Sequence, residues 1–394
     1  MPDSAMLNAI RQLVSKERLL DTALRLIEIP SPTRSAAAVA DCLADVLVSD
    51  GFTVERSDCG WPDAPAVACR FDSGQPGRTL QFNGHLDTVH LPFVPPRVEN
   101  GLLYGSGASD MKGGIAATVE ALRAVRDSGL LTGGSILLTA HELHESPWGD
   151  GSQVDGLIEA GFIGDAVLLP EYCHDPLPIA GRGLAILEIT VTRPGEPTHE
   201  VLGGIEQPSV LLAGADIVRK FAEIDASLAE EMHATAGRAS LFLGQLHAGE
   251  IYNQSPTELK LSGTRRWLSG TNVDEIRTGI EATLAVIAER HGISIDSQFH
   301  FVRDAYEIDP ASEFVESFQS AHESVTGRRL ATGAKPFVDD GNTFVHRGGI
   351  PAITHGPNAL GAHTVNEEVP VAELVRVAEV YALTALSFCC LPSA

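Results

Sequence analysis

The sequence predicts an α/β protein in two parts: a domain with a mostly parallel sheet flanked by helices, and a smaller α+β unit inserted into it. Three observations support this prediction. Short apolar runs alternate with segments of helical periodicity as far as residue 180, a pattern typical of strand–helix–strand units. From residue 181 the order changes to long strand candidates with two long helices. The length of 394 residues is too great for one ordinary core and suits two domains.

The first domain is expected to comprise residues 1–180 and 299–394. Apolar spacing predicts helices at 7–29, 36–49, 110–128 and 154–160. The first of these should end at Pro30, because proline cannot continue a helix. Short apolar runs predict strands at 52–56, 66–71, 79–82, 135–140 and 166–169. A helix at 312–326 and apolar runs at 350–354 and 374–388 complete the domain.

The inserted unit, expected at residues 181–298, has a different order of elements. Long β-type runs predict strands at 184–192, 239–245, 258–262 and 297–302. Helical periodicity predicts helices at 208–221 and 273–291. The sequence therefore predicts a small α+β unit between two stretches of the first domain.

The composition excludes several classes of protein. Hydrophobic residues make up 44% of the chain and charged residues 20%, which is typical of a folded globular protein. A formal net charge of -24 repels nucleic acid and anionic membranes, so neither is expected as a partner. The N-terminal segment lacks the apolar run of a signal peptide, and the six cysteines form no CxxC pair. We therefore expect a cytoplasmic protein with reduced thiols.

Two short motifs place polar residues next to predicted elements. His85 and Asp87 stand two apart at the end of a predicted strand, in NGHLDT. A carboxylate beside an imidazole can fix its tautomer for metal binding, although the pair can equally be a hydrogen-bonded pair without a metal. Asp110 lies in the glycine-rich run GSGASDMKGG, where it is either a helix N-cap or a group that faces a ligand.

The densest group of polar residues follows the predicted strand at 135–140. Within five residues stand His141, Glu142, His144 and Glu145. The carboxyl ends of parallel strands are where α/β proteins place their sites. The spacing is not that of an HExxH zinc motif, because the two histidines are three residues apart.

We predict a divalent-metal site built from these segments and two more distant residues. Glu171 follows the predicted strand at 166–169, and His363 stands in GAHT. The predicted ligands are His85, Asp110, Glu145, Glu171 and His363. Imidazole and carboxylate donors without thiolate suit Zn first, and also Mn or Co. One or two ions per chain are expected, and His144 is left open as a further ligand.

The ordered motifs resemble those of the M20 family of metallopeptidases, the group of carboxypeptidase G2, acetylornithine deacetylase and succinyl-diaminopimelate desuccinylase. NGHLDTV, YGSGASDMKGG, a paired-acid segment, a lone glutamate after the next strand and GAHTVNEE follow the family's order over nearly the whole chain. The resemblance implies that residues 1–180 and 299–394 form the metal-binding catalytic domain and 181–298 a lid or dimerisation domain. It also implies a homodimer, to which the run 184–192 would supply an edge strand.

The resemblance implies a role for each residue of the site. His85 and Glu171 would bind one metal, His363 the second, and Asp110 both, while Asp87 would orient His85. In the inserted unit the implied substrate-binding residues are His199, Asn253 and Arg266. The histidine would stabilise an oxyanion, the asparagine would contact substrate, and the arginine would bind a substrate carboxylate through its guanidinium.

One departure from the family concerns the general base. The family shows two adjacent glutamates, the first a base and the second a ligand. Counting without gaps from Gly134 places His144 at the base position and Glu145 at the ligand position. A shifted alignment makes Glu142 the base but leaves Leu143 at the ligand position. We prefer the ungapped alignment, because it keeps a carboxylate ligand.

The expected function is hydrolysis of an amide in a small, carboxylate-bearing N-acyl amino acid or dipeptide-like substrate, by metal-activated water. Two alternatives remain open. One is an aminohydrolase of the same fold that releases ammonia from an activated aromatic amine, which the altered base position would suit. The other is a metal-binding scaffold without catalytic activity.

Overall fold

The computed structural model describes residues 4–146 and 149–392, and the chain divides into two compact units. The first unit comprises the chain up to Ile179, Glu307–Lys335 and the residues from Asp339; the second comprises Ala180–Tyr306 and Pro336–Val338. The predicted return to the first domain at residue 299 falls inside a strand. This strand, β14, runs without interruption from Ser294 to Arg303, so the return comes later than the sequence indicated.

A six-stranded sheet forms the centre of the first unit. Its strands are β1 (Val54–Ser57), β2 (Ala66–Asp72), β3 (Thr79–His85), β6 (Ser135–His141), β7 (Ala166–Leu169) and β17 (Ala352–Thr354). Their order is β1-β2-β6-β3-β7-β17. The four strands from β6 to β17 are parallel. At one edge β2 is antiparallel to β6, and β1 is antiparallel to β2. The predicted mostly parallel α/β sheet is confirmed.

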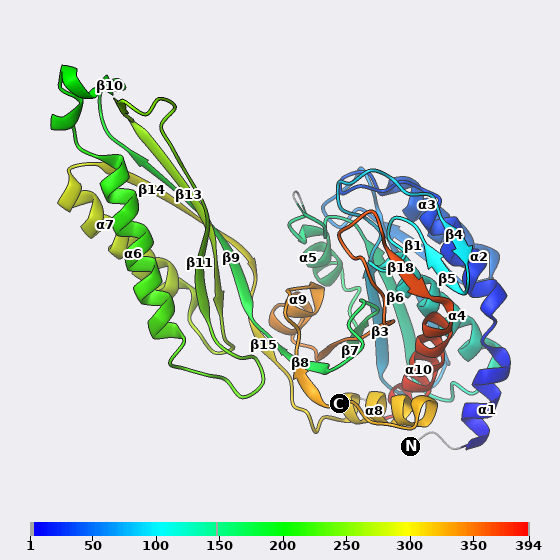
Figure 1. Ribbon diagram of the computed structural model, residues 1–394. Helices are drawn as coiled ribbons and strands as arrows, with labels where there is room; N and C mark the ends of the chain where they lie inside the picture. The colour runs from blue at the N-terminus through cyan, green and yellow to red at the C-terminus, as the bar shows by residue number, and fades with distance from the viewer. Residues whose placement is uncertain (1–3, 147–148, 393–394) are drawn as a thin grey trace. The chain divides into compact units, whose positions relative to one another are not determined.

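Helices cover both faces of this sheet (Figure 1). They are α1 (Ser4–Leu13), α2 (Lys16–Ile27), α3 (Ala37–Ser49), α4 (Lys112–Ser128), α5 (Ser152–Glu159), α8 (Glu313–Thr326), α9 (Asp340–His346) and α10 (Val371–Cys389). Alternate residues of a strand face opposite sides. Phe82, in register with Leu168, packs on Tyr381 of α10, whereas Val167 packs with Phe344 of α9. The α9 face of the sheet is the one that matters below.

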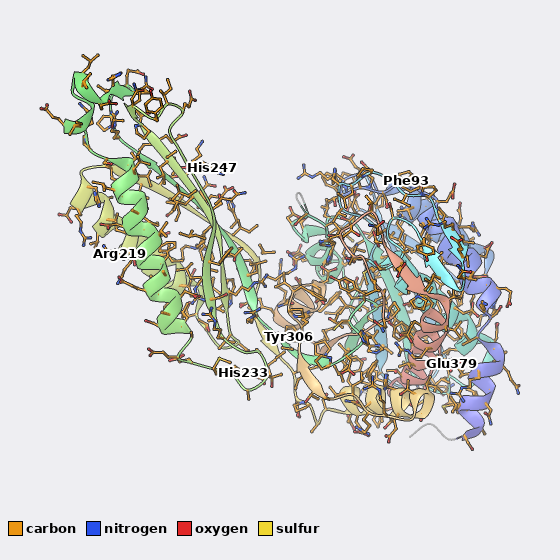
Figure 2. All side chains as sticks on the ribbon, viewed as in Figure 1. Phe93, Arg219, His233, His247, Tyr306 and Glu379 are labelled. Carbon is orange, nitrogen blue, oxygen red and sulfur yellow. The ribbon has the colours of Figure 1, made fainter. Side chains whose placement is uncertain are left out.

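The helix predicted at 7–29 is two helices, α1 and α2. The break is at Ser15, whose hydroxyl caps α2 by accepting the Arg18 N–H. The Ser15 N–H donates to the buried carboxylate of Glu120 at 2.7 Å. That bond satisfies a buried charge at the expense of one helical hydrogen bond. Glu379 of α10 accepts a bond from Arg11 of α1 (Figure 2).

Short strands complete the first unit and the chain's passage between the units. One small sheet has the order β18-β5-β4, and another has the order β15-β8-β16. These strands are β4 (Arg97–Glu99), β5 (Leu102–Tyr104), β8 (Leu177–Gly181), β15 (Tyr306–Glu307), β16 (Thr332–Ala334) and β18 (Glu368–Pro370). β18 pairs with β5 and so brings the segment after His363 against the segment before Asp110.

The second unit is an antiparallel sheet with two helices on one face. Its main elements are β9 (Gly183–Thr192), α6 (Val210–Leu228), β11 (Ser240–Ala248), β13 (Glu258–Trp267), α7 (Val273–His291) and β14. Four shorter elements are β10 (Thr198–His199), η1 (Glu200–Leu202), η2 (Gly204–Glu206) and β12 (Gln254–Ser255). Alternate residues of β9, such as Leu187 and Ile189, pack with Ile217 of α6 and Leu284 of α7.

The strand expected to form an edge is in the interior of this sheet. The order is β11-β13-β9-β14, so β9 has a partner on each side and the edges are β11 and β14. No helix in the described part of the chain has the length and apolar character needed to cross a membrane. All six cysteines are free thiols.

Candidate metal centre

Polar side chains gather where the parallel strands β3, β6 and β7 end. His85 is the last residue of β3, His144 and Glu145 follow β6, and Glu171 comes two residues after β7. Because the strands are parallel, their carboxyl ends share one edge of the sheet. The side chains of His85, Glu145 and Glu171 are buried there. These side chains converge on Asp110.

Asp110 stands between two histidines. Its Oδ1 lies 3.1 Å from His85 Nε2, and its Oδ2 lies 3.3 Å from His363 Nε2. The N-cap of α4 is Met111, so the aspartate is not the helix cap that its sequence position also allowed. Each carboxylate oxygen therefore faces a different imidazole.

A buried subsite lies on one side of Asp110, formed with His85, His144 and Glu171. Glu171 Oε1 lies 3.7 Å from His85 Nε2 and 3.9 Å from His144 Nε2. The two imidazole rings stack with centroids 4.0 Å apart and planes 7° apart. Both rings thus present Nε2 to the same carboxylate.

An exposed subsite lies on the other side, formed by Asp110, Glu145 and His363. His363 Nε2 is 3.2 Å from Glu145 Oε2. The His363 backbone has a φ of 61°, and 54% of its side chain is exposed. Hydrogen bonds with Asp110 and Glu145 raise the pKa of His363 to about 10.

The donors suit a divalent cation in each subsite. Donor atoms 3.1–3.9 Å apart match the roughly 3–4 Å expected between ligands at about 2.1 Å from one ion. All the donors are imidazole nitrogens or carboxylate oxygens, which suits zinc and manganese. Burial and then the charge of the neighbouring Asp110 raise the pKa of Glu171. A cation bound beside the two carboxylates would oppose both effects.

Asp87 supports the site through two different groups. Its main-chain carbonyl lies 3.0 Å from His85 Nδ1, while its carboxylate Oδ1 is 3.6 Å from that nitrogen. Its Oδ2 accepts the N–H groups of His144 and Glu145 and the Thr33 hydroxyl. The carbonyl therefore orients the histidine, and the carboxylate orders the loop that carries the next two candidates.

Glu367 is a supporting residue that the sequence did not single out. Its buried carboxylate accepts the N–H groups of Gly107, Ser109 and Asp110 and the Ser109 hydroxyl. It thereby fastens the Asp110 loop to the segment that begins at His363. The only signal in the sequence was its position four residues after that histidine.

The two candidates for the base have different surroundings. The carboxylate of Glu142 accepts the Ala36 N–H at 3.1 Å and the Trp61 indole N–H at 3.0 Å, and it belongs to neither subsite. His144 contributes Nε2 to the buried subsite and donates through Nδ1 to Asp340. Burial opposes a charge on His144, but Asp340 raises its pKa to about 9. Asp340 was not predicted, and the short run DDGN was its only signal.

The three predicted substrate-binding residues belong to the second unit. His199 Nε2 lies 3.0 Å from Asn253 Nδ2, and His199 Nδ1 accepts the Val201 N–H. Arg266 lies on β13, and its Nη1 is buried without a hydrogen-bond partner among the described residues. Burial and then Arg182 lower the pKa of Arg266. No carboxylate among the described residues pairs with this guanidinium.

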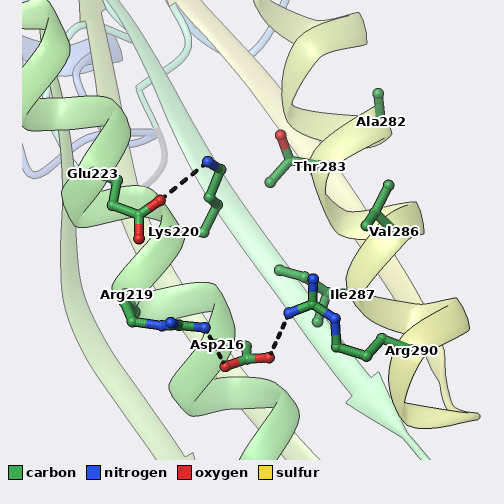
Figure 3. Close-up of a pocket in the computed structure, with 9 residues that line it drawn as sticks. All are labelled: Asp216, Arg219, Lys220, Glu223, Ala282, Thr283, Val286, Ile287 and Arg290. Atoms are coloured by element: carbon green, nitrogen blue, oxygen red, sulfur yellow. Dashed lines mark hydrogen bonds and ion pairs between the residues drawn. The ribbon is translucent and has the colours of Figure 1, made fainter.

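A groove between α6 and α7 in the second unit offers no comparable chemistry (Figure 3). Its charged residues are paired with one another, Arg219 and Arg290 with Asp216, and Lys220 with Glu223. No group of three metal-binding side chains occurs there within the described chain. The site is therefore assigned to the cluster around Asp110.

Comparison with known proteins gives a family match and similar relatives. The family model described as "Peptidase family M20/M25/M40" matches residues 81–387. Succinyl-diaminopimelate desuccinylase of Alkalilimnicola ehrlichii is 29% identical over 381 residues, which is 92% of this chain and 96% of the relative. N-formyl-4-amino-5-aminomethyl-2-methylpyrimidine deformylase of Bacillus subtilis is 24% identical, covering 95% of each chain.

A solved structure supports the fold. Aminopeptidase PepT from Bacillus cereus superposes with a TM-score of 0.81, covering 95% of this chain and 99% of its own. The two sequences are 18% identical, so this likeness concerns the fold alone.

Proposed function

We propose that this chain, which belongs to peptidase family M20/M25/M40 and is a hydrolase of carbon–nitrogen bonds, cleaves the amide of a small N-acyl amino acid or dipeptide-like substrate with a free carboxylate. One observation carries the proposal: the two oxygens of Asp110 face His85 and His363, with Glu171 and Glu145 beside them. This arrangement provides two adjacent cation subsites that share a carboxylate.

A metal bound there would polarise a carbonyl and lower the pKa of water. We propose zinc as the ion, with manganese or cobalt as substitutes, and one ion per subsite. The ligands would be His85, Asp110 and Glu171 in the buried subsite, and Asp110, Glu145 and His363 in the exposed one. Neither subsite contains a thiolate, which supports an ion that accepts nitrogen and oxygen ligands.

We propose His144 as the general base. A cation bound beside His144 would oppose a positive charge on its ring, and because Nδ1 is engaged by Asp340, Nε2 would then be the nitrogen that accepts a proton from the attacking water. The same nitrogen would return the proton to the leaving amine. Glu142 is a poorer candidate, because its carboxylate is occupied by the Ala36 N–H and the Trp61 indole.

Substrate binding is assigned to the second unit. We propose that Arg266 binds the substrate carboxylate, and its partnerless buried Nη1 supports this role. His199, held by Asn253, would donate to the developing oxyanion. We also propose that the protein is cytoplasmic and forms a homodimer. Light scattering of the purified protein tests the dimer.

The experiment is a hydrolysis assay on N-acetyl and N-succinyl amino acids and on dipeptides. The protein is stripped with a chelator and reloaded with zinc, manganese or cobalt. We expect metal-dependent release of the free amine together with the acyl acid. Release of ammonia without an acyl product would indicate an aminohydrolase reaction in place of amide hydrolysis. No turnover with any metal or substrate would overturn the proposal.

A further inference from the structure

We propose that Asp340 is the positioning residue for His144, holding the imidazole so that the lone pair of Nε2 faces the buried subsite. This inference rests on the proposed function, in which His144 is the base. It adds a residue from a distant part of the chain, 196 positions further on, to the catalytic machinery.

The hydrogen bond determines which nitrogen carries the proton. Asp340 Oδ2 lies 3.0 Å from His144 Nδ1. An ionised carboxylate only accepts, so Nδ1 must donate and a neutral ring then has its lone pair on Nε2. That nitrogen lies 3.9 Å from Glu171 Oε1, and the ring is stacked on His85. The ring is therefore constrained along one edge and one face.

Asp340 is itself held in place by His141. The Nε2 of His141 lies 2.9 Å from the same Oδ2, and its Nδ1 lies 2.9 Å from the Glu142 carbonyl, so each ring nitrogen faces an acceptor. His141 pairs in register with His85, so both side chains leave the sheet on the same face. Asp340 begins α9, which packs against β7 and β17. The parallel register and α9 together bring the carboxylate between two imidazoles.

This support matters because the base is an imidazole and not a carboxylate. Either oxygen of a glutamate can accept a proton, whereas a neutral imidazole has one lone pair, which must be on the correct nitrogen. Asp340→Asn keeps the side chain's size but can offer an N–H to Nδ1, and that stabilises the opposite tautomer. We expect kcat to fall by about 10–100-fold or more with little change in KM, because the substrate-binding groups are untouched.

The matched control is Asp165→Asn. Asp165 is an exposed residue whose carboxylate accepts the Thr79 N–H at the opposite end of β3. It should leave kcat, KM and metal content at their wild-type values. Equal thermal midpoints of the two variants would show that the loss in Asp340→Asn is not a folding defect. His144→Asn provides a double-mutant cycle, in which adding Asp340→Asn should cause little further loss.

The second readout is the tautomer of His144 in the zinc-loaded protein. Long-range 1H–15N spectra of protein with 15N-labelled histidine distinguish the two nitrogens, and the His144→Asn spectrum assigns the signals. We expect a protonated Nδ1 and an unprotonated Nε2 in the wild type, and loss of the proton from Nδ1 in Asp340→Asn. The wild-type spectrum decides the question even if the variant does not fold.

The outcomes separate the two proposals. Absence of amide hydrolysis by the wild type would overturn the proposed function, while the tautomer would still test Asp340. A wild-type His144 without a proton on Nδ1, or an Asp340→Asn protein with wild-type kcat, would overturn the positioning role. A lower kcat with an unchanged tautomer would overturn it too, because the loss would then be structural.

Discussion

The two proposed subsites around Asp110 share its carboxylate but differ in their surroundings. The buried subsite places His85 at the end of a central strand, with its ring fully buried and stacked on His144. The exposed subsite depends on His363, a loop residue with a positive φ and a half-exposed ring. His85 is therefore held by the sheet, whereas His363 is held by a single loop.

This difference predicts unequal affinity for metal. Ligands that are oriented before binding lose less conformational entropy when the ion arrives. His85 is fixed by the Asp87 carbonyl and by burial, whereas the His363 loop depends on Glu367 and on the pairing of β18 with β5. The buried subsite should therefore fill first and release its ion last.

The largest effect should come from removing the carboxylate that the two subsites share. Asp110→Asn keeps the shape but replaces one carboxylate oxygen with an amide group, which cannot ligate in the same way. We expect both ions to bind more weakly and turnover to fall by more than about 100-fold, beyond the effect of losing an outer partner. Metal content after gel filtration and kcat are the measurements, with Asp165→Asn as the control. Retention of a full metal complement would contradict a shared ligand.

A smaller effect should follow from loosening the segment that carries His363. Glu367→Gln retains one acceptor but places an amide N–H among the N–H groups of Gly107, Ser109 and Asp110. We expect the weaker metal affinity to fall by about 10–100-fold while the tighter affinity changes less. Competition with a chromophoric chelator measures both. An equal fall in the two affinities would show that Glu367 does not distinguish the subsites.

A buried histidine outside the cluster shows, by contrast, how the carboxylates affect the pKa of His85. His355 is as buried as His85, but neither of its ring nitrogens has a hydrogen-bond partner among the described residues. The carboxylates raise the pKa of His85 against the effect of burial, whereas burial and then Arg376 lower that of His355. Burial without a neighbouring carboxylate therefore lowers the pKa of an imidazole, and the carboxylates around His85 reverse that effect.

The smallest expected effect is on stability in acid. The unfolded chain protonates His355 near pH 6.5 while the folded chain does not, so its stabilising contribution is present above that pH and is lost as the pH falls. We expect the free energy of unfolding to lose about 1.4 kcal/mol per pH unit below 6.5, relative to His355→Gln. Denaturant unfolding from pH 7 to 5 measures this difference. The exposed His346→Gln is the control, and equal slopes in wild type and His355→Gln would contradict the account.

The sequence predicted the cluster because its residues directly follow short apolar strands. Parallel strands end at one edge, so His85, Glu145 and Glu171 had to lie near one another once the sheet was parallel. The mostly parallel sheet is confirmed. The roles of the individual ligands remain proposals supported by their distances.

Other features depended on contacts that no local pattern carries. Asp340 reaches His144 from a seven-residue helix with little periodicity to mark it. Glu142 is an alternative base by sequence, and its carboxylate accepts bonds from Ala36 and Trp61, residues far away in the sequence. The interior position of β9 depends on its pairing with β13 and β14. The alternation of apolar and polar residues along a strand is the same at an edge as in the interior, so it does not predict this position.

The most direct test of a shared, two-subsite centre is a zinc titration of metal-free protein, comparing the wild type with His363→Ala. Calorimetry should resolve two ions per wild-type chain, one bound more tightly than the other. In the variant the weaker event should disappear, and the tighter one should remain with nearly its wild-type affinity. A single ion in the wild type, or loss of both ions in the variant, would contradict the account.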